Sequence, residues 1–369
     1  MVIGILRESM PETRVSLTDE GVVALLKKGV EVVVEQGAGL QAFCDDEAYR
    51  RAGATVLSAM EVMARSSVLL CIHPPSMEQL PALQHKVIIG AYQPLFQQEW
   101  SAAVAKHNIT CFSLDMLPRT TRAQAMDILS SQANIAGYKA VLLAATTYSR
   151  YFPMFMTAAG SIAPAKVLIL GAGVAGLQAI ATAKRLGAVI EVFDTRPAVK
   201  EEVMSLGAKF IEVEGAADAS KAGGYAVEQS ADYLQRQSER IAAAVTKADI
   251  IITTAQIPGK KAPILITEAM IASLRAGAVI VDLAAATGGN TPFTENNKTI
   301  LREGVTIIGN SSLFCSMPAD ASKLYGKNVI NFLQLLLNKE GQLQLNWNDE
   351  LVKGCCITHE GQIVHERLK

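Results

Sequence analysis

The strongest chemical signal in the sequence is a glycine-rich turn that follows an apolar run and precedes a helical pattern. It reads Gly171-Ala172-Gly173-Val174-Ala175-Gly176, which is the G-x-G-x-x-G spacing. In that spacing the first glycine permits a tight turn, the second lets the backbone approach a pyrophosphate, and the third lets helix and strand pack closely. Amides at the helix N-terminus then face the phosphates. Because the turn has a strand pattern before it and a helix pattern after it, the motif predicts a dinucleotide site.

An acidic residue stands where such a site needs one. Asp194 follows the next apolar run, at about the 20-residue distance from Gly176 at which a carboxylate binds the ribose hydroxyls. The carboxylate favours NAD over NADP because it repels a 2′-phosphate. Thr195 and Arg196 come next, and the arginine can hold that phosphate instead, cover the adenine or pair with an acidic neighbour. We weigh Asp194 more heavily and predict NAD(H) as the cofactor.

Two further turns follow later apolar runs. The first, residues 253–259, contains Thr254, Ala255 and Gln256, and the second begins at Asp282. Both lie at the predicted carboxyl ends of strands, where open α/β sheets bind ligands. We predict that they line the nicotinamide half of the site, with an ordinary turn as the alternative for each.

A second polar group of residues lies earlier in the chain. Gln124, Asp127 and either Ser130 or the serine after it fall at i, i+3 and i+6 or i+7, which predicts one face of a helix. An amide, a carboxylate and a hydroxyl can hold a carboxamide and a ribose, and none of the three is a good proton shuttle. Arg119 can bridge to a phosphate or to Asp127. The alternative is a polar helix turn that faces only water.

The elements that must position these residues follow a repeating pattern. Apolar runs alternate with helical patterns, which predicts βαβ units and parallel sheets. Strands are expected at 2–6, 30–34, 54–57, 68–72, 87–89 and 109–112, and again at 167–170, 189–193, 209–213, 250–253, 279–283 and 305–308. Helices are expected at 19–28, 97–106, 175–186, 199–206, 227–246 and 268–274.

Two longer helical patterns, residues 122–148 and 319–337, bracket the second block, and short strand-like runs at 342–347 and 355–358 follow it. We therefore predict an α/β protein of two doubly wound Rossmann-like domains, joined by two long helices with a cleft between them. The first domain is expected to be discontinuous, 1–125 plus 318–369, and the second to be the NAD(H)-binding domain, 135–317.

Composition excludes several classes of protein. At 369 residues, about two domains are expected. A hydrophobic fraction of 50% excludes intrinsic disorder, and a net charge of -1 argues against a nucleic-acid binder that neutralises phosphates. The opening residues lack the layout of a signal peptide, and we expect neither a membrane-spanning helix nor a metal site. The six cysteines form no C-x-x-C pair, which favours buried thiols in a reducing, cytoplasmic compartment.

Residues spread over the chain resemble one superfamily, which contains the alanine dehydrogenases and the NAD(H)-binding domain I of proton-translocating nicotinamide nucleotide transhydrogenase. The resemblance covers essentially the whole chain. It is carried by Arg7-Glu8 with Glu12-Thr13-Arg14-Val15, by the Gly171–Gly176 turn with Asp194-Thr195-Arg196-Pro197, and by Ile257-Pro258-Gly259 with Ala262-Pro263.

Three departures separate the two branches. Alanine dehydrogenases resemble this chain but have a lysine where it has His73, a histidine where it has Gln93 and an aspartate where it has Ala286. Oxidation of an amino acid needs proton donors and acceptors at the reacting carbon, so these departures argue against an amino-acid substrate. His73 can titrate, but we interpret it as structural. An alanine dehydrogenase-like enzyme stays the alternative, and a catalytically silent NAD-sensing protein is a third hypothesis.

The segment from Pro118 to Tyr138 resembles the transhydrogenase loop beside the nicotinamide. The resemblance implies Gln124, Asp127, Arg119 and Ser130 as the catalytic set. Hydride transfer between two nicotinamides needs alignment of the two rings and no general base. The run Gly223-Gly224-Tyr225-Ala226 resembles the family's mobile loop, whose tyrosine closes over the nucleotide, with a flexible surface loop as the alternative.

The resemblance also implies partners. NADP(H) is bound on a separate domain III, and protons pass through a membrane domain II. We therefore expect a homodimer that is cytoplasmic and attached peripherally to the cytoplasmic face of the inner membrane through its partner subunits. Neither nucleic-acid binding nor direct membrane insertion is expected. The chain resembles domain I, either as its own polypeptide or within a longer one.

Overall fold

The computed structural model describes residues 1–217, 229–257 and 259–369. The chain forms two compact units, the first made of Met1–Gln132 with Cys315–Lys369 and the second of Ala133–Phe314. Each unit is built on a largely parallel β-sheet with helices, so the predicted α/β class with two Rossmann-like domains is confirmed. The first crossing between the units falls inside α5 (Ile128–Thr147), and the second falls in the short turn Leu313–Ser316. The other long helix, α10 (Pro318–Leu336), belongs to the first unit alone.

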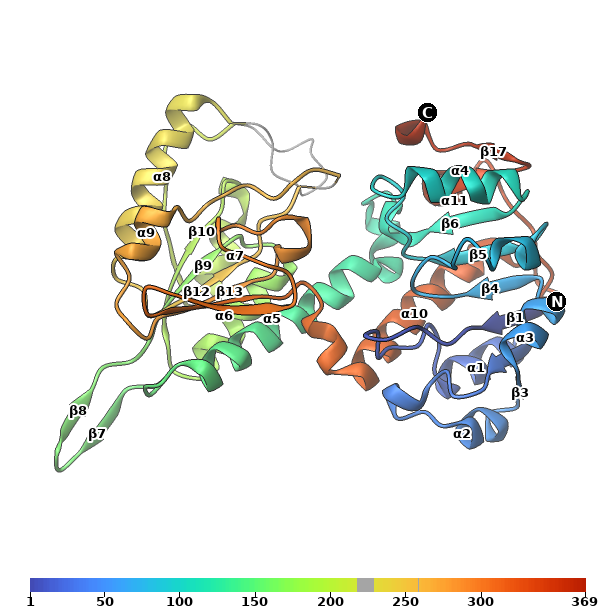
Figure 1. Cartoon of the computed structure of the whole chain (residues 1–369), viewed down its shortest axis with the longest axis horizontal. Helices are drawn as coiled ribbons and strands as arrows, with labels where there is room; N and C mark the ends of the chain where they lie inside the picture. Colours follow the sequence, from blue (N-terminus) through green and yellow to red (C-terminus); the bar gives the residue numbers. More distant parts are fainter. Residues whose placement is uncertain (218–228, 258) are drawn as a thin grey trace. The chain divides into compact units, whose positions relative to one another are not determined.

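The sheet of the first unit has the strand order β17-β16-β6-β5-β4-β1-β2-β3 (Figure 1). Its strands are β1 (Val2–Ile5), β2 (Glu31–Glu35), β3 (Thr55–Leu57), β4 (Val68–Leu70), β5 (Val87–Gly90), β6 (Thr110–Ser113), β16 (Cys356–His359) and β17 (Gln362–Ile363). The six strands from the N-terminal segment pair in parallel. The two strands from the C-terminal segment extend the sheet antiparallel beyond β6.

Helices cover both faces of this sheet. Successive residues of its strands point to opposite faces, and both sets are therefore buried. Ile3, Ile5 and Leu70 pack in the core cluster that includes α10 residues such as Phe332. Leu69 and its neighbours on the other face pack against α3 and α4. The helices are α1 (Asp19–Leu26), α2 (Asp46–Arg51), α3 (Ala59–Arg65), α4 (Gln98–Lys106), α10 and α11 (Glu350–Cys355). Burial on both faces explains why the strands are continuous apolar runs in the sequence.

The sheet of the second unit has the order β11-β10-β9-β12-β13-β15-β14, and Figure 1 labels β9, β10, β12 and β13. Its strands are β9 (Lys166–Leu170), β10 (Val189–Phe193), β11 (Lys209–Phe210), β12 (Ile250–Thr253), β13 (Val279–Asp282), β14 (Lys298–Arg302) and β15 (Val305–Gly309). Its helices are α6 (Val174–Arg185), α7 (Lys200–Ser205), α8 (Ala231–Val245) and α9 (Glu268–Ala272), with most of α5. A separate hairpin, β7 (Phe155–Thr157) with β8 (Gly160–Ile162), precedes β9.

Several predicted elements differ in the structure. The helix predicted at 122–148 begins instead as a 3-10 turn, η4 (Thr121–Met126), and α5 starts only after Asp127. The strand predicted at 342–347 is reduced to one bridge between Leu337 and Leu343. The antiparallel edge strand β14 and the β7–β8 hairpin were not predicted. No helix in the described ranges combines the length and the apolar character that a membrane span requires.

Candidate functional site

The glycine turn of the second unit joins β9 to α6, and its three glycines have different surroundings. Gly171 has φ +106, and an added Cβ would lie 2.3 Å from the Thr254 hydroxyl. At Gly176 an added Cβ would lie 1.9 Å from the carbonyl oxygen of Gly171. At Gly173 it would meet no atom of the described chain within 4 Å. The middle glycine therefore faces open space, where a dinucleotide phosphate needs backbone approach.

The N-terminus of α6 supplies the amides for that phosphate. Gly173 is its N-cap and carries no side chain, and the first turn from Val174 to Leu177 contains only uncharged residues. Helix N-termini with exposed amides attract anions. Ala175 packs closely against α5, since an added Cβ at Gly137 would lie 2.1 Å from the Ala175 carbonyl oxygen. The glycine turn and the start of α6 are thus held against α5 and against the turn that contains Thr254, both in the same unit.

Asp194 lies directly after β10 and is tied to the glycine turn. Its Oδ2 accepts a 2.7 Å hydrogen bond from the backbone N–H of Ala172, and its Oδ1 accepts one of 2.8 Å from the backbone N–H of Arg196. The Arg196 guanidinium donates to both carboxylate oxygens, which raises the pKa of Arg196 despite partial burial. The sequence left three roles open for Arg196, and in the structure it pairs with an acidic neighbour, Asp194. Thr195, between the two, is half-buried.

The turn after β12 is anchored from both sides. Thr254 donates its hydroxyl to the carbonyl oxygen of Gly171 at 3.2 Å. Ala255 exchanges two hydrogen bonds with the side chain of Asn290, at 3.1 and 2.9 Å. Gln256 donates its amide to the carbonyl oxygen of Leu283 at 2.9 Å. The structure therefore brings Thr254, Ala255 and Gln256 to the same carboxyl edge of the sheet as the glycine turn. Sequence reasoning gave Asn290 no specific role, although this buried amide joins the two turns.

Asp282, predicted as a cofactor ligand, is held by hydrogen bonds within its own unit. Its side chain is fully buried, and its carboxylate accepts hydrogen bonds from the backbone of Ala284 and Asn290 and from the Thr294 hydroxyl. This carboxylate therefore holds the turn after β13 in place, and a role as a cofactor ligand stays a prediction. Tyr225, the predicted lid residue, lies outside the described residues.

The predicted catalytic set belongs to the first unit, whereas the turns described above belong to the second. Asp127 has an extended backbone, with φ -75 and ψ 93. Its Oδ1 accepts the backbone N–H of Ser130 at 2.9 Å, and its Oδ2 accepts the Ser130 hydroxyl at 2.6 Å. Asp127 therefore caps the start of α5, because a carboxylate satisfies an amide that the first helical turn leaves unpaired. The prediction of one continuous helix face is wrong at this residue.

Gln124 lies in the 3-10 turn before Asp127, and its side chain is exposed. Helix α10 holds this turn in place, since Asn328 and Asn331 both donate their side-chain amides to the carbonyl oxygen of Ala125 at 2.9 Å. Arg119, on the segment leading into the turn, is also exposed. An anchored backbone with an exposed amide and a half-buried carboxylate is suited to orienting a ligand.

A buried ion pair lies elsewhere in the first unit, and its geometry was not predicted. Arg14 donates to both carboxylate oxygens of Glu12, at 2.9 and 2.6 Å, and to the Gln132 amide oxygen at 3.0 Å. His73 contacts Glu12 Oε2 at 2.8 Å. Burial would raise the pKa of Glu12, but the hydrogen bonds from Arg14 and His73 outweigh it and hold that pKa well below its ordinary range. The structure thus gives His73 a structural partner.

Comparisons with known proteins agree with this geometry. The model "Alanine dehydrogenase/PNT, N-terminal domain" matches residues 4–136, and "Alanine dehydrogenase/PNT, C-terminal domain" matches residues 140–366. A Rickettsia prowazekii protein, named as the first portion of NAD(P) transhydrogenase subunit alpha, is 46% identical over 360 residues, covering 96% of this chain and 93% of the relative. A protein of the same name from Rhodospirillum rubrum is 44% identical over 379 residues, covering 100% of this chain and 99% of the relative.

Similarity to alanine dehydrogenases is weaker. An alanine dehydrogenase of Staphylococcus haemolyticus is 26% identical over 380 residues, covering 99% of this chain and 95% of the relative. Among solved structures, a transhydrogenase from Sinorhizobium meliloti matches with a TM-score of 0.90 and 43% identity, covering 99% of this chain and 100% of that one. An L-alanine dehydrogenase matches with a TM-score of 0.84 at 22% identity, covering 100% of this chain and 98% of that one, which supports the fold alone.

Proposed function

The chain belongs to the alanine dehydrogenase/PNT family, and we propose that it is the NAD(H)-binding component of a proton-translocating transhydrogenase. The observation that carries the proposal is the edge of the second sheet, where Asp194 is fixed beside the open backbone at Gly173. That pairing fits the ribose and pyrophosphate of a dinucleotide. The names of relatives with 44% and 46% identity along nearly their whole length favour transhydrogenase over alanine dehydrogenase.

The proposed reaction is direct hydride transfer between NADH bound to this chain and NADP+ bound to a partner domain III. The bound nicotinamides supply the hydride chemistry: a C4–H bond breaks on one ring and forms on the other, with the electron pair moving with the hydrogen. The protein has to align the two C4 atoms at about 3–3.5 Å. No proton changes hands at the protein in this step, so the site needs orienting groups rather than a general base.

The residues divide this work in the proposal. Amides of the Gly171–Gly176 turn and of α6 bind the pyrophosphate, and Asp194 binds the adenosine ribose. The backbone around Thr254 to Gln256 borders the nicotinamide half. Gln124, Asp127, Ser130 and Arg119 orient the dihydronicotinamide for transfer. Water is excluded when the partner domain covers the rings, which prevents loss of the hydride to solvent.

The partners follow from the same proposal. The names of the relatives describe one portion of an alpha subunit, which indicates that those proteins work within a complex. We infer that this chain meets an NADP(H)-binding domain III and a membrane domain II that couples hydride transfer to proton translocation. It would then be held peripherally on the cytoplasmic face of the inner membrane by those subunits.

The β7–β8 hairpin supports the proposed homodimer. A two-stranded hairpin by itself is only marginally stable in water. This hairpin also exposes several large apolar side chains, which a partner surface could cover. Phe155 is 43% exposed, Met156 75% and Ile162 44%. Apolar groups gathered on one projecting element are typical of an interface, and a second copy of the chain is the partner that the family resemblance implies. Sedimentation of the purified chain measures this oligomeric state.

Mixing the purified chain with a domain III protein tests the function. We expect NADH-dependent reduction of an NADP+ analogue only when both proteins are present, and no alanine-dependent formation of NADH by the chain alone. The reverse result would establish the amino-acid dehydrogenase. Absence of both activities, with NADH still bound, would favour the NAD-sensing protein.

A further inference from the structure

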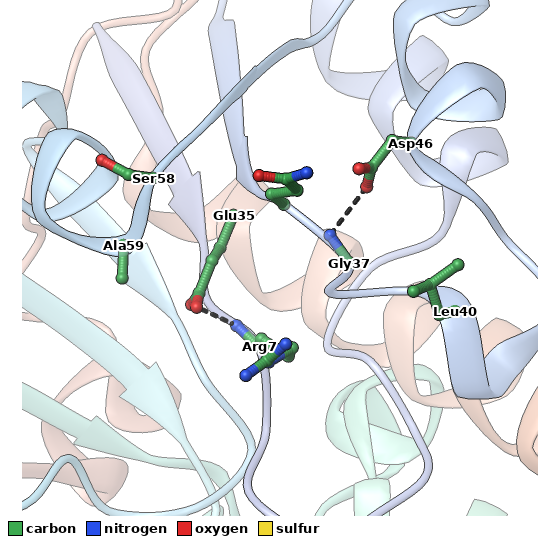
Figure 2. Close-up of a pocket in the computed structure, with 8 residues that line it drawn as sticks. Arg7, Glu35, Gly37, Leu40, Asp46, Ser58 and Ala59 are labelled. Atoms are coloured by element: carbon green, nitrogen blue, oxygen red, sulfur yellow. Dashed lines mark hydrogen bonds between the residues drawn. The ribbon is translucent and has the colours of Figure 1, made fainter.

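The first unit contains a small polar pocket at the carboxyl edge of its own sheet. It is an open pocket with a volume of about 360 Å³, and it is lined by Arg7, Glu35, Gln36, Gly37, Leu40, Asp46, Ser58 and Ala59 (Figure 2). We propose that this pocket is a second ligand site, which binds a ribose carrying a single phosphate, as in a nucleoside monophosphate. The proposal does not depend on hydride transfer, but it rests on the proposed role of Asp194 as the ribose ligand of the second unit.

The main argument is that the first unit repeats the ribose-binding geometry of the second. In the second unit, Leu170 ends β9 and pairs with Phe193 on β10, and Asp194 is the next residue. In the first unit, Ile5 ends β1 and pairs with Val34 on β2, and Glu35 is the next residue. The two sheets also share the strand order around these positions, with β2-β1-β4 matching β10-β9-β12.

The hydrogen bond that fixes each carboxylate is repeated as well. Asp194 accepts the backbone N–H of Ala172, two residues after the end of β9, at 2.7 Å. Glu35 accepts the backbone N–H of Arg7, two residues after the end of β1, at 2.8 Å. An acidic residue at the end of the second strand is the group that binds ribose hydroxyls in dinucleotide sheets. Register and hydrogen bond together assign Glu35 the same position.

Glu35 also has acceptor capacity that Asp194 lacks. Arg196, two residues after Asp194, donates its guanidinium to that carboxylate. Gly37 holds the matching position after Glu35 and has no side chain to do so. Glu35 lies on the pocket wall, and in the described chain Arg7 N–H is its one hydrogen-bond donor. A carboxylate can accept about four hydrogen bonds, so both hydroxyls of a ribose can be bound.

Arg7 supplies the positive charge for a phosphate. Its side chain is exposed on the pocket, and its guanidinium has neither an ion-pair nor a hydrogen-bond partner within the described ranges. One terminal nitrogen lies 3.8 Å from where a Cβ of Gly37 would stand, so the guanidinium lies over that glycine. A guanidinium presents paired donors that match phosphate geometry.

The pocket favours one phosphate rather than two. The glycine turn and helix N-terminus that hold a pyrophosphate in the second unit have no counterpart in the described segment directly after β1. Helix α1 begins only at Asp19, and its first turn carries two carboxylates, Asp19 and Glu20. The pocket itself offers one guanidinium, Arg7, beside the carboxylates of Glu35 and Asp46, which favours a single phosphate. The volume is at the lower end of the roughly 300–1,000 Å³ usual for ligand pockets, which suits a mononucleotide, with Leu40 as an apolar wall for its base.

Equilibrium dialysis of AMP against the intact chain saturated with NADH tests the proposal, because NADH fills the Asp194 site. We expect one AMP bound per chain, and Glu35→Gln and Arg7→Gln each to weaken binding by about 10- to 100-fold, the scale of one charge-assisted hydrogen bond. NADH affinity should stay unchanged in both variants, which also establishes that they fold. Glu47→Gln, in the exposed Arg50–Glu47 pair of α2, is the matched control and should bind AMP normally.

Two smaller ligands separate the contributions of the base, the ribose and the phosphate to binding. Ribose 5-phosphate should bind within about tenfold of AMP, and inorganic phosphate far more weakly, because the carboxylate recognises the hydroxyls. Equal binding of phosphate and ribose 5-phosphate would overturn the ribose assignment. Absence of AMP binding up to about 10 mM, or wild-type binding by both pocket variants, would overturn the site itself.

Discussion

The guanidinium of Arg196 donates to both carboxylate oxygens of Asp194, from Nε to Oδ1 at 2.8 Å and from a terminal nitrogen to Oδ2 at 2.7 Å. Backbone amides of Arg196 and Ala172 donate to the same two oxygens. Four donors match the roughly four acceptor sites of a carboxylate. If Asp194 is the proposed ribose ligand, ribose hydroxyls reach its carboxylate only when the Arg196 side chain gives up its place, and the two residues would then set cofactor affinity together.

Replacing Asp194 by alanine should weaken NADH binding by about 1–3 kcal/mol, because a charge-assisted hydrogen bond to the ribose is lost. Fluorescence titration of NADH measures the change. Glu191→Gln on the same strand is the control, since Glu191 pairs with Lys209 away from the turn. Unchanged affinity in Asp194→Ala would show that this carboxylate is not the ribose ligand.

Replacing Arg196 by methionine should leave NADH bound at least as tightly as in the natural chain. The substitution removes the two side-chain donors that compete with the ribose hydroxyls, while the Ala172 N–H still orients the carboxylate. The same titration, repeated with NADPH, measures discrimination at the 2′ position. A marked loss of NADH affinity would instead mean that Arg196 contacts the bound nucleotide directly.

The buried Glu12–Arg14 pair predicts a dependence of stability on pH. Because the pKa of Glu12 is lowered in the folded chain, its ionised form stabilises the fold above its ordinary pKa of 4.5, and this contribution is lost as the pH falls below that value. The unfolding free energy of the natural chain should therefore decrease between about pH 5 and pH 3, and less steeply in Glu12→Gln.

At neutral pH Glu12→Gln should cost about 3–5 kcal/mol, because Arg14 is left buried without its counter-charge. Urea denaturation across the pH range measures both effects. Glu47→Gln breaks an exposed pair and should cost only about 0–1 kcal/mol. Equal pH profiles for the natural chain and Glu12→Gln would contradict the assignment of the shifted carboxyl to Glu12.

Much of the second unit was predictable from local sequence. β10 and β12 have the bounds that the apolar runs gave, 189–193 and 250–253, because a buried parallel strand is a continuous apolar run between turn residues. The glycine turn was predictable for a similar reason. Gly171 and Gly176 meet constraints that a larger residue would violate, Gly173 leaves its backbone open, and this combination is visible in spacing alone.

Other features depended on tertiary partners. Periodicity placed Asp127 on a helix face, but an aspartate can equally cap a helix. The hydrogen bond from the Ser130 backbone N–H to Asp127, which is visible only in the folded structure, decides for the cap. Asp282 is the last residue of β13, whereas Asp194 comes just after β10, and packing of the 284–294 segment buries Asp282 completely. Glu35 and Asp194 occupy matching positions only because β1 pairs with β2 in the same register as β9 with β10. The pattern of a single strand does not specify this register.

Asp127 separates a capping role from a ligand role. Asp127→Asn keeps an oxygen to accept the Ser130 N–H, so stability should change little, whereas Asp127→Ala should lose about 1 kcal/mol with the cap. If the carboxylate also binds the NADH ribose, Asp127→Asn should still slow hydride transfer to a domain III partner. Stopped-flow transfer and thermal unfolding of the two variants measure this, and normal transfer in Asp127→Asn would restrict the residue to capping.

Gln124 gives the sharpest test of how the ring is oriented. Gln124→Asn keeps the amide but retracts it by one methylene, and misplacement of about 1 Å can cost on the order of 100-fold in rate. NADH affinity should change far less, because the phosphates and Asp194 carry most of the binding. Since Gln124 is exposed on a turn anchored through the Ala125 carbonyl, the fold should tolerate the change.

The expected result is therefore a large fall in single-turnover hydride transfer with near-normal NADH binding, the signature of a group that acts in the transition state. Gln97→Asn, also exposed in the first unit but outside the predicted catalytic set, is the control and should transfer hydride normally. Equal losses in rate and affinity would make Gln124 a ground-state ligand. No loss in either would remove Gln124 from the site. The main residue-level reason for preferring a transhydrogenase over an amino-acid dehydrogenase would then be lost as well.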